Sequence, residues 1–143
     1  MSWENSSKLV GDKGEKIACE YLVEKGYKIL AKNYSISFGE IDIIAKKKWR
    51  FKNLFIRNHS INSGQVIHFI EVKTIIDADS SFFPEERVDF NKQKKLRQMA
   101  EIWLEKNKFS QNQPYQIDVV GIQINQDIKK VKINYFENVV EDK

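Results

Sequence analysis

Hydrophobic residues recur along this chain with two different periods. Segments 7–24 and 89–107 carry apolar positions at helical spacing, namely Ile17, Ala18, Tyr21 and Leu22 in the first and Leu96, Met99, Ala100, Trp103 and Leu104 in the second. We therefore predict a helix in each segment. The first helix is expected to end at Gly26, because glycine readily adopts the left-handed conformation of a helix C-cap.

Five shorter apolar runs predict strands, over 28–33, 40–45, 66–74, 116–124 and 129–137. The predicted order is α-β-β-β-α-β-β, an α/β fold in which helices pack on a sheet. No internal repeat, low-complexity segment or linker rich in proline and glycine divides the chain. With 143 residues it is long enough to bury one core, so we predict a single domain over 1–143.

Composition narrows the class of protein. Charged residues make up 31% and hydrophobic residues 41% of the chain, which is typical of a globular protein. The N-terminus lacks the apolar core of a signal peptide, and no apolar run is long enough to cross a bilayer. We therefore expect a cytoplasmic protein that does not associate with a membrane. Cys19 is the only cysteine, which excludes an intrachain disulfide and a thiolate zinc site.

The net charge of +4 is unevenly spread. One basic stretch lies in the segment at about 46–64, where Trp49, Phe51 and Phe55 are interleaved with Lys46, Lys47, Lys48, Arg50, Lys52 and Arg57. A second contains Lys92, Lys94, Lys95 and Arg97. Lysines that contact phosphates and rings that stack on bases would suit nucleic acid, although a solvated basic face explains the charge equally well.

The most informative residues are acidic side chains inside apolar strands. Asp42 lies in the run 39–45, and Glu71 lies in the run 66–73 next to Val72 and Lys73. Side chains on a strand alternate between faces, so Glu71 and Lys73 are expected to point the same way. By the same rule Asp42 shares a face with Glu40, and Ile41 and Ile43 share the opposite face. Charges are unfavourable inside a sheet, which indicates a purpose for this cluster.

Two carboxylates beside a lysine can hold a hard cation that gathers water and phosphate oxygens. Asp42 and Glu71 would bind the ion, with the carbonyl of Val72 as a further ligand. Lys73 would orient or deprotonate the attacking water, or stabilise charge during phosphodiester cleavage. The alternative is a simple salt bridge, but one lysine cannot neutralise both carboxylates. Mg²⁺ is the expected ion, and Mn²⁺ would fit the same ligands.

Four further residues have positions that call for an interpretation. Glu15 lies roughly 90° from the centre of the first helical stripe, where it is either a further site carboxylate or an ordinary surface residue. Lys92 lies one turn before Leu96, where a bound phosphate would explain a lysine near a helix N-terminus. Asp118 and His68 are interpreted as structural, and His68 is expected on the face opposite Glu71.

The motifs resemble the PD-(D/E)xK nuclease superfamily, and more closely the bacterial YraN-like family. The matching residues run in order through nearly the whole chain: Gly11 to Glu15, Gly26 to Leu30, Asn33, Gly39 to Ala45, Phe69 to Thr74, Lys92, Leu96, Ala100, Asp118 to Val120, and Glu137 with Asn138. The resemblance implies a restriction-endonuclease-like mixed β-sheet flanked by helices. It also implies a divalent-metal site at Glu15, Asp42, Glu71 and Lys73.

Three positions depart from the family pattern, because Ile75, Gln116 and Tyr34 stand where relatives usually carry arginine. The stretch between the two site strands is also longer than usual for the family, so the basic-aromatic segment at about 46–64 is an insertion. We hypothesise that nucleic-acid contacts have moved partly onto this insertion. The expected contacts are Lys92, Lys95, Lys48, Arg50, Lys52 and Arg57.

The function expected from these residues is that of a divalent-metal-dependent nuclease acting on DNA or RNA, including branched or structured forms. A non-catalytic nucleic-acid-binding protein and a structural adaptor are the alternatives. A homodimer is compatible with the sequence, which does not fix the oligomeric state.

Overall fold

The computed structural model describes residues 3–48, 65–77 and 90–140, and the side chains of residues 7 onward within them. Its elements follow the order expected from the hydrophobic pattern: α1 (Trp3–Glu24), β1 (Tyr27–Ile36), β2 (Gly39–Lys47), β3 (Ile67–Ile76), α2 (Phe90–Lys106), β4 (Tyr115–Asn125) and β5 (Lys130–Phe136). Most boundaries fall within three residues of the predicted ones, and α1 begins four residues earlier. The insertion at 46–64 lies largely outside the described residues.

The five strands form one mixed sheet in the order β1-β2-β3-β4-β5. β3 and β4 are parallel, and the other neighbouring pairs are antiparallel. The parallel pair requires a crossover connection, and α2 lies in it. Gly26 has a φ of 89° directly after α1, which confirms the predicted left-handed helix end.

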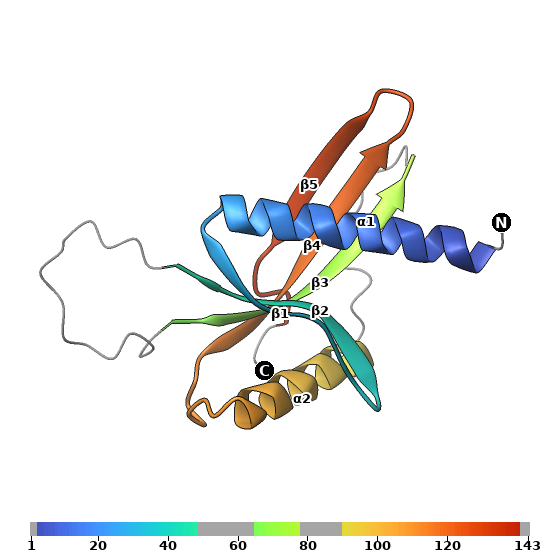
Figure 1. Cartoon of the computed structure of the whole chain (residues 1–143). Coiled ribbons are helices and arrows are strands. Elements are labelled where there is room, and N and C mark those ends of the chain that lie inside the picture. The colour runs from blue at the N-terminus through green and yellow to red at the C-terminus, as the bar shows by residue number, and fades with distance from the viewer. Residues whose placement is uncertain (1–2, 49–64, 78–89, 141–143) are drawn as a thin grey trace, which may run out of the picture.

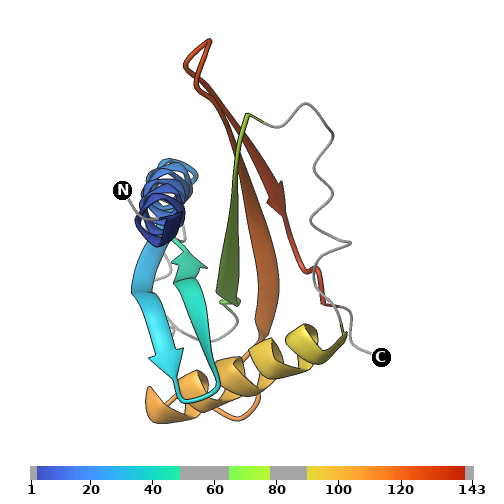
Figure 2. The same cartoon turned by 90° about the vertical axis from the view of Figure 1, so that its right-hand side faces the viewer.

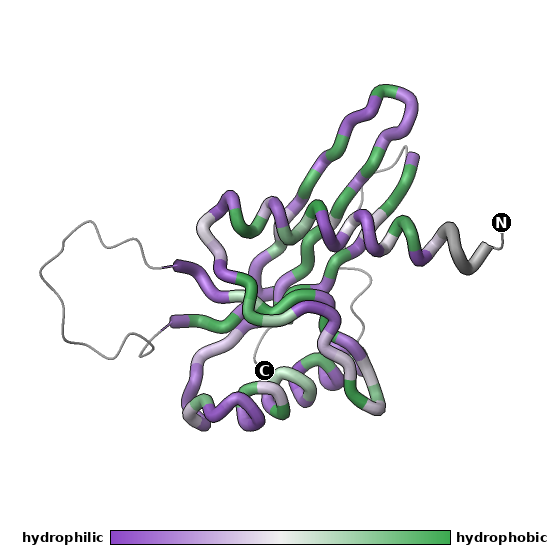
Figure 3. Tube along the Cα trace, viewed as in Figure 1, coloured by the Kyte–Doolittle hydropathy of each residue, from purple (hydrophilic) through white to green (hydrophobic). Residues whose placement is uncertain are grey.

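The two helices cover opposite faces of the sheet, as Figure 1 shows. α1 packs through Ala18 and Leu22 against one core cluster, which includes Ile43, Ile70 and Val120. α2 packs against the other through its buried stripe, Leu96, Met99, Ala100, Trp103 and Leu104. Hydrophobic and hydrophilic residues alternate along both helices in Figure 3, as expected of helices with one face on a sheet. The mixed α/β fold predicted from the sequence is therefore confirmed.

The pairing between β2 and β3 is short. It runs from Lys46 with Ile67 to Ile43 with Ile70 and stops there. Beyond that point the β1–β2 hairpin turns toward α2, while β3 continues beside β4 (Figures 1 and 2). The sheet is thus open between the two strands at the positions that follow Ile70 on β3 and precede Ile43 on β2.

One expectation from strand alternation is wrong. Ile41 packs in the α2-side cluster and Ile43 in the α1-side cluster, so they do not share a face. The register of β1 with β2 places Asn33 opposite Asp42, and Asn33 has a φ of 50°, in the left-handed region. A left-handed residue interrupts the pleat, and the neighbouring strand changes the direction of its side chains at Asp42.

None of the helices in the described ranges has an apolar stretch that could span a bilayer.

Candidate functional site

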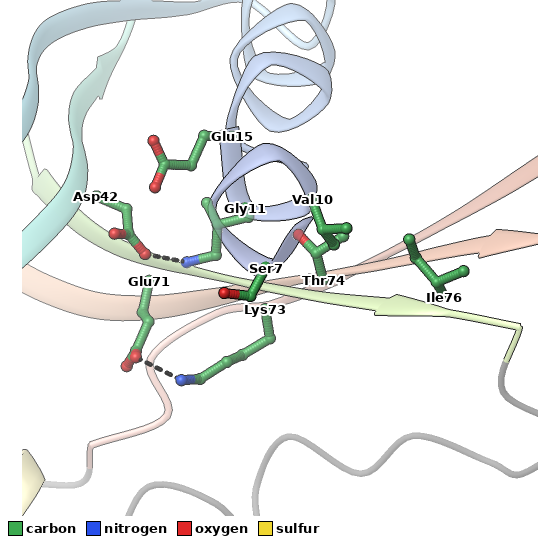
Figure 4. A pocket seen from close by; sticks show the side chains of 10 residues that line it. Ser7, Val10, Gly11, Glu15, Asp42, Glu71, Lys73, Thr74 and Ile76 are labelled. Carbon is green, nitrogen blue, oxygen red and sulfur yellow. Dashed lines mark hydrogen bonds and ion pairs between the residues drawn. The ribbon is translucent and has the colours of Figure 1, made fainter. Parts of the chain in front are cut away.

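The opening between β2 and β3 forms a pocket of about 480 Å³ beneath the first half of α1. Glu15 from α1, Asp42 from β2, and Glu71, Val72 and Lys73 from β3 line it. Figure 4 shows the carboxylates of Glu15 and Asp42 approaching from the helix and the strand, with the Lys73 amine directed at Glu71. The structure therefore brings together the residues that were expected to form the site.

Asp42 takes over a hydrogen bond that the sheet ladder no longer makes. Its Oδ2 accepts from the backbone N–H of Val72 at 2.8 Å. By the register of the two strands Val72 would pair with Ile41, but the ladder ends two pairs earlier, at Ile43 with Ile70. In an antiparallel ladder the N–H and C=O of one residue point to the same neighbour, so the Val72 carbonyl is directed toward the same opening.

The environment disfavours ionised Asp42. Burial raises the pKa of this carboxyl, and the charges of Glu71 and Glu40 raise it further. The Val72 N–H and the charge of Lys73 act in the opposite direction without cancelling the effect. Among the described residues no ion pair reaches Asp42. A cation placed in the pocket would stabilise the ionised carboxylate.

The two carboxylate oxygens of Glu71 differ in their contacts. Its Oε1 contacts the amines of both Lys73, at 2.9 Å, and Lys92. Its Oε2 is buried and accepts no hydrogen bond from the part of the chain that the structure describes. The side chain is only 14% exposed, so water compensates this oxygen poorly. A buried carboxylate oxygen without a donor is a natural metal ligand.

Lys73 is held in its charged form. Burial lowers the pKa of the amine, but the hydrogen bond and the charge of Glu71 outweigh burial, so the pKa is raised. The protonated amine can donate a hydrogen bond or stabilise negative charge, and it is a poor base.

Glu15 occupies the boundary position expected from the helical wheel and is half-buried. Burial is the largest cause that raises the pKa of its carboxyl, followed by the charge of Asp42, while a hydrogen bond with the Asn33 side chain lowers it. The helix is held close to β3 at the preceding residue: a Cβ at Gly14 would lie 1.7 Å from Thr74 Oγ1. Glycine at this position lets Glu15 reach the pocket.

Sequence reasoning did not assign a role to Asn33, Ser7 or Thr74. The Asn33 side chain bonds Glu15, and Ser7 and Thr74 line the pocket. An asparagine inside a predicted strand was the available signal, because asparagine tolerates the left-handed region better than other non-glycine residues.

Three of the six predicted nucleic-acid contacts lie within the described residues. Lys92 is half-buried and bonds Glu71, whereas Lys95 and Lys48 are exposed on α2 and after β2. Arg50, Lys52 and Arg57 lie outside the described residues. No group of three or more His, Cys, Asp or Glu side chains within 3–48, 65–77 and 90–140 is close enough to hold a metal ion. A site here would therefore consist of Asp42, Glu71 and the Val72 carbonyl, with Glu15 at its edge.

This small donor set fits one kind of ion. Mg²⁺ binds through one or two carboxylates and keeps several water molecules, which substrate phosphates can replace. The Glu71 Oε2, which accepts no hydrogen bond from the described residues, and the repulsion of Asp42 with both Glu15 and Glu71 are compatible with such a cation. The residues present thus fit a hydrated Mg²⁺ or Mn²⁺ better than a cation that requires a full protein cage.

His68 lies on the opposite face from Glu71, as expected, and Asp118 lies beside it. His68 Nδ1 is 2.6 Å from Asp118 Oδ2, and Tyr135 donates to the same oxygen. Asp118 Oδ1 accepts from the Asn138 backbone and from the Gln116 side chain, each at 2.8 Å. Burial raises the pKa of Asp118, but these hydrogen bonds outweigh it and lower the pKa. This cluster joins β3, β4 and β5 and serves the fold.

Comparison with known proteins gives a consistent family. Residues 14–122 match the family described as "Uncharacterised protein family UPF0102". A UPF0102 protein of Caldanaerobacter subterraneus is 37% identical over 134 residues, which is 93% of this chain and 95% of the relative. UPF0102 proteins of Thermodesulfovibrio yellowstonii and Campylobacter fetus are 37% and 36% identical, over 90% and 92% of this chain and 93% of each relative. This is the bacterial family that the sequence motifs indicated, and the chain belongs to the uncharacterised protein family UPF0102.

Proposed function

We propose that this protein is a divalent-metal-dependent nuclease that hydrolyses phosphodiester bonds in DNA or RNA, with a restriction-endonuclease-like sheet. The observation that carries the proposal is the pair of Asp42 and Glu71 at the end of the β2–β3 ladder. One of their four oxygens is buried without a donor, while Lys73 lies against another. The two strands separate around largely buried carboxylates and a charged lysine, and this arrangement suits chemistry on phosphate better than the interior of a core.

The chain would divide the work among few groups. Asp42, Glu71 and the Val72 carbonyl would hold Mg²⁺ or Mn²⁺, which supplies an activated water and neutralises charge on the phosphate. The protonated Lys73 would donate to the attacking water or to a phosphate oxygen and stabilise the charge that develops there. Glu15, whose pKa is raised, would exchange a proton with water at the edge of the pocket.

The ion pair of Lys92 with Glu71 adds a positive group on the α2 side of the pocket. In the absence of substrate the two lysines share one carboxylate oxygen. A phosphate would offer Lys92 a second negatively charged partner besides Glu71. Lys92 is therefore assigned to substrate binding, and Lys73, on the same strand as Glu71, to the reacting group.

The same lysine contacts also favour a second function, a non-catalytic nucleic-acid-binding protein in which Glu71 is only a salt-bridge partner. Cleavage of labelled substrates by the purified chain separates the two functions. The panel contains single-stranded, duplex, flap and four-way-junction DNA and structured RNA, each with Mg²⁺, Mn²⁺ or EDTA. Cleavage that requires metal and disappears in Asp42→Asn and Lys73→Ala supports the nuclease. Binding that survives in both variants, with no cleavage by the wild type, supports the binder.

A further inference from the structure

A second hollow adjoins the proposed site on its α2 side. It has a volume of about 360 Å³ and lies between the β1–β2 turn and the first turns of α2. Buried Leu96 and Met99 form its floor, and Phe38 from the turn lines it. Its volume is within the range of pockets that hold small ligands, about 300–1,000 Å³. Nothing in the proposed cleavage reaction requires this hollow.

Phe38 is the unusual residue of the turn. Its side chain is 42% exposed although it belongs to a hairpin that packs on a helix. An aromatic ring held at the rim of a cavity is a stacking platform, and every nucleic-acid base has a flat face that can stack on it.

Two cations, a polar amide and one carboxylate, that of Glu40 on β2, complete the surroundings. Lys92 and Lys95 line the hollow from α2, and Asn91 lies in the same turn of the helix. Lysines suit the phosphate of a nucleotide, and an asparagine amide can pair with the edge of a base. The hollow thus has an apolar floor, an aromatic wall and a rim on which two lysines outnumber one carboxylate, which suits one nucleotide better than a lipid or an apolar peptide.

Lys92 also connects the hollow to the carboxylate pocket. It lines the hollow while its amine bonds Glu71, a residue of the other pocket. A nucleotide in the hollow would therefore place its phosphate next to the position of the cleaved bond. The Lys92–Glu71 ion pair thus links the lining of one pocket to that of the other.

The hairpin is fixed in this place by close packing. A Cβ at Gly39 would lie 2.8 Å from Met99 Sδ, so the turn rests directly on α2. Phe38 is thereby held one residue from that contact. A turn whose backbone is already ordered loses little entropy when a ligand binds to it.

We propose that this hollow, the Phe38 pocket, binds an unpaired nucleotide adjacent to the scissile phosphate. The base stacks on Phe38 above Leu96 and Met99, and its phosphate lies between Lys92 and Lys95. This inference rests on the proposed nuclease function and specifies its substrate class, namely nucleic acid with a single-stranded segment at the cleavage position. A base inside a duplex is already stacked on its neighbours and is not available to this pocket.

The test measures binding without cleavage. A flap DNA with 2-aminopurine at the unpaired position and a blunt duplex of the same sequence are titrated with the wild-type chain in EDTA at fixed ionic strength. We expect the wild type to prefer the flap by about tenfold and to quench the probe, since stacking of one base contributes about 1–3 kcal/mol. Phe38→Ala should lose both the preference and the quenching, and Phe38→Trp should retain them.

The matched control is Ile128→Ala, at the β4–β5 turn, where Ile128 is 63% exposed and outside both pockets. It should bind as the wild type does. The proposal is overturned if Phe38→Ala keeps the flap preference, or if the wild type shows no preference or no binding. Because the assay contains no metal, its result is separate from that of the cleavage panel. A nuclease that depends on Asp42 but is indifferent to Phe38 would refute only the pocket.

Discussion

Asp42 and Asp118 are two aspartates in apolar strands of the same sheet, and their surroundings differ in every respect. Asp118 is fully buried and receives hydrogen bonds on both oxygens from His68, Tyr135, Gln116 and the Asn138 backbone. Asp42 accepts one, from the Val72 N–H, and faces other carboxylates. The pKa of Asp118 is lowered, and that of Asp42 is raised.

The difference teaches how to separate a structural acid from a functional one. A carboxylate that the protein satisfies with its own donors contributes to folding stability. A carboxylate left close to like charges is tolerated at the expense of stability, which is the usual sign of a group used for binding or chemistry. The β2–β3 opening creates the second situation, because the pairing of the two strands ends before it reaches Asp42.

Replacing each aspartate with alanine should give the largest contrast. Asp118→Ala leaves His68, Tyr135 and two further donors without their acceptor, and we expect the free energy of unfolding to fall by about 3–5 kcal/mol. Asp42→Ala removes repulsion along with one hydrogen bond, so its stability should change by less than about 1 kcal/mol. Urea unfolding followed by circular dichroism measures both. Equal losses of stability would show that the two acids do not differ in kind.

The two lysines on Glu71 should separate in the cleavage assay. Lys73→Ala removes the positive group nearest the reacting phosphate, and we expect the rate to fall by about 10²–10³-fold. Lys92→Ala weakens substrate binding, so it should mainly raise KM, by about tenfold. Steady-state kinetics on the preferred substrate of the panel resolves the two parameters. Identical effects on kcat would mean that both lysines have the same role.

Two glycines of α1 test how the helix supports the site. Gly14→Ala forces the helix away from Thr74, and we expect a loss of about 1–3 kcal/mol in unfolding free energy together with reduced cleavage. Gly11 has no atom within 4 Å of an added Cβ, so Gly11→Ala should stabilise the helix by about 0.5–1 kcal/mol. Thermal unfolding measures the pair. A tolerated Gly14→Ala would contradict the close approach of α1 to β3.

The pH dependence of stability should reveal the lowered pKa of Asp118. Its folded pKa lies below its unfolded value of about 3.9, so the ionised group stabilises the fold above that pH. This stability is lost as pH falls through the folded pKa. Urea unfolding of the wild type and Asp118→Asn between about pH 2 and 6 should show a difference that narrows below about pH 4. A constant difference would place the stabilisation elsewhere.

Much of this arrangement was predictable from the sequence. The helical stripes of α1 and α2 and the apolar strands are local patterns, and they located the elements to within a few residues. The alternation rule also placed His68 opposite Glu71 correctly. Local patterns were sufficient wherever one element has one buried face.

The rest depended on contacts between distant residues. Alternation placed Ile41 and Ile43 on one face, because it assumes a regular pleat that the left-handed Asn33 interrupts. The bond of Lys92 with Glu71 joins residues 21 positions apart and requires α2 to cross the open end of the sheet. The hollow beside Phe38 arises from a hairpin packed on a helix, which no periodicity encodes.

The most direct test of the account compares Asp42→Asn and Asp118→Asn on the same labelled substrate with Mg²⁺ or EDTA, with rates normalised to the folded fraction. We predict metal-dependent cleavage by the wild type, its loss in Asp42→Asn at unchanged stability, and its retention in the less stable Asp118→Asn. Cleavage by Asp42→Asn at the wild-type rate, or no metal-dependent cleavage by the wild type, would contradict the assignment of the β2–β3 opening as a nuclease site.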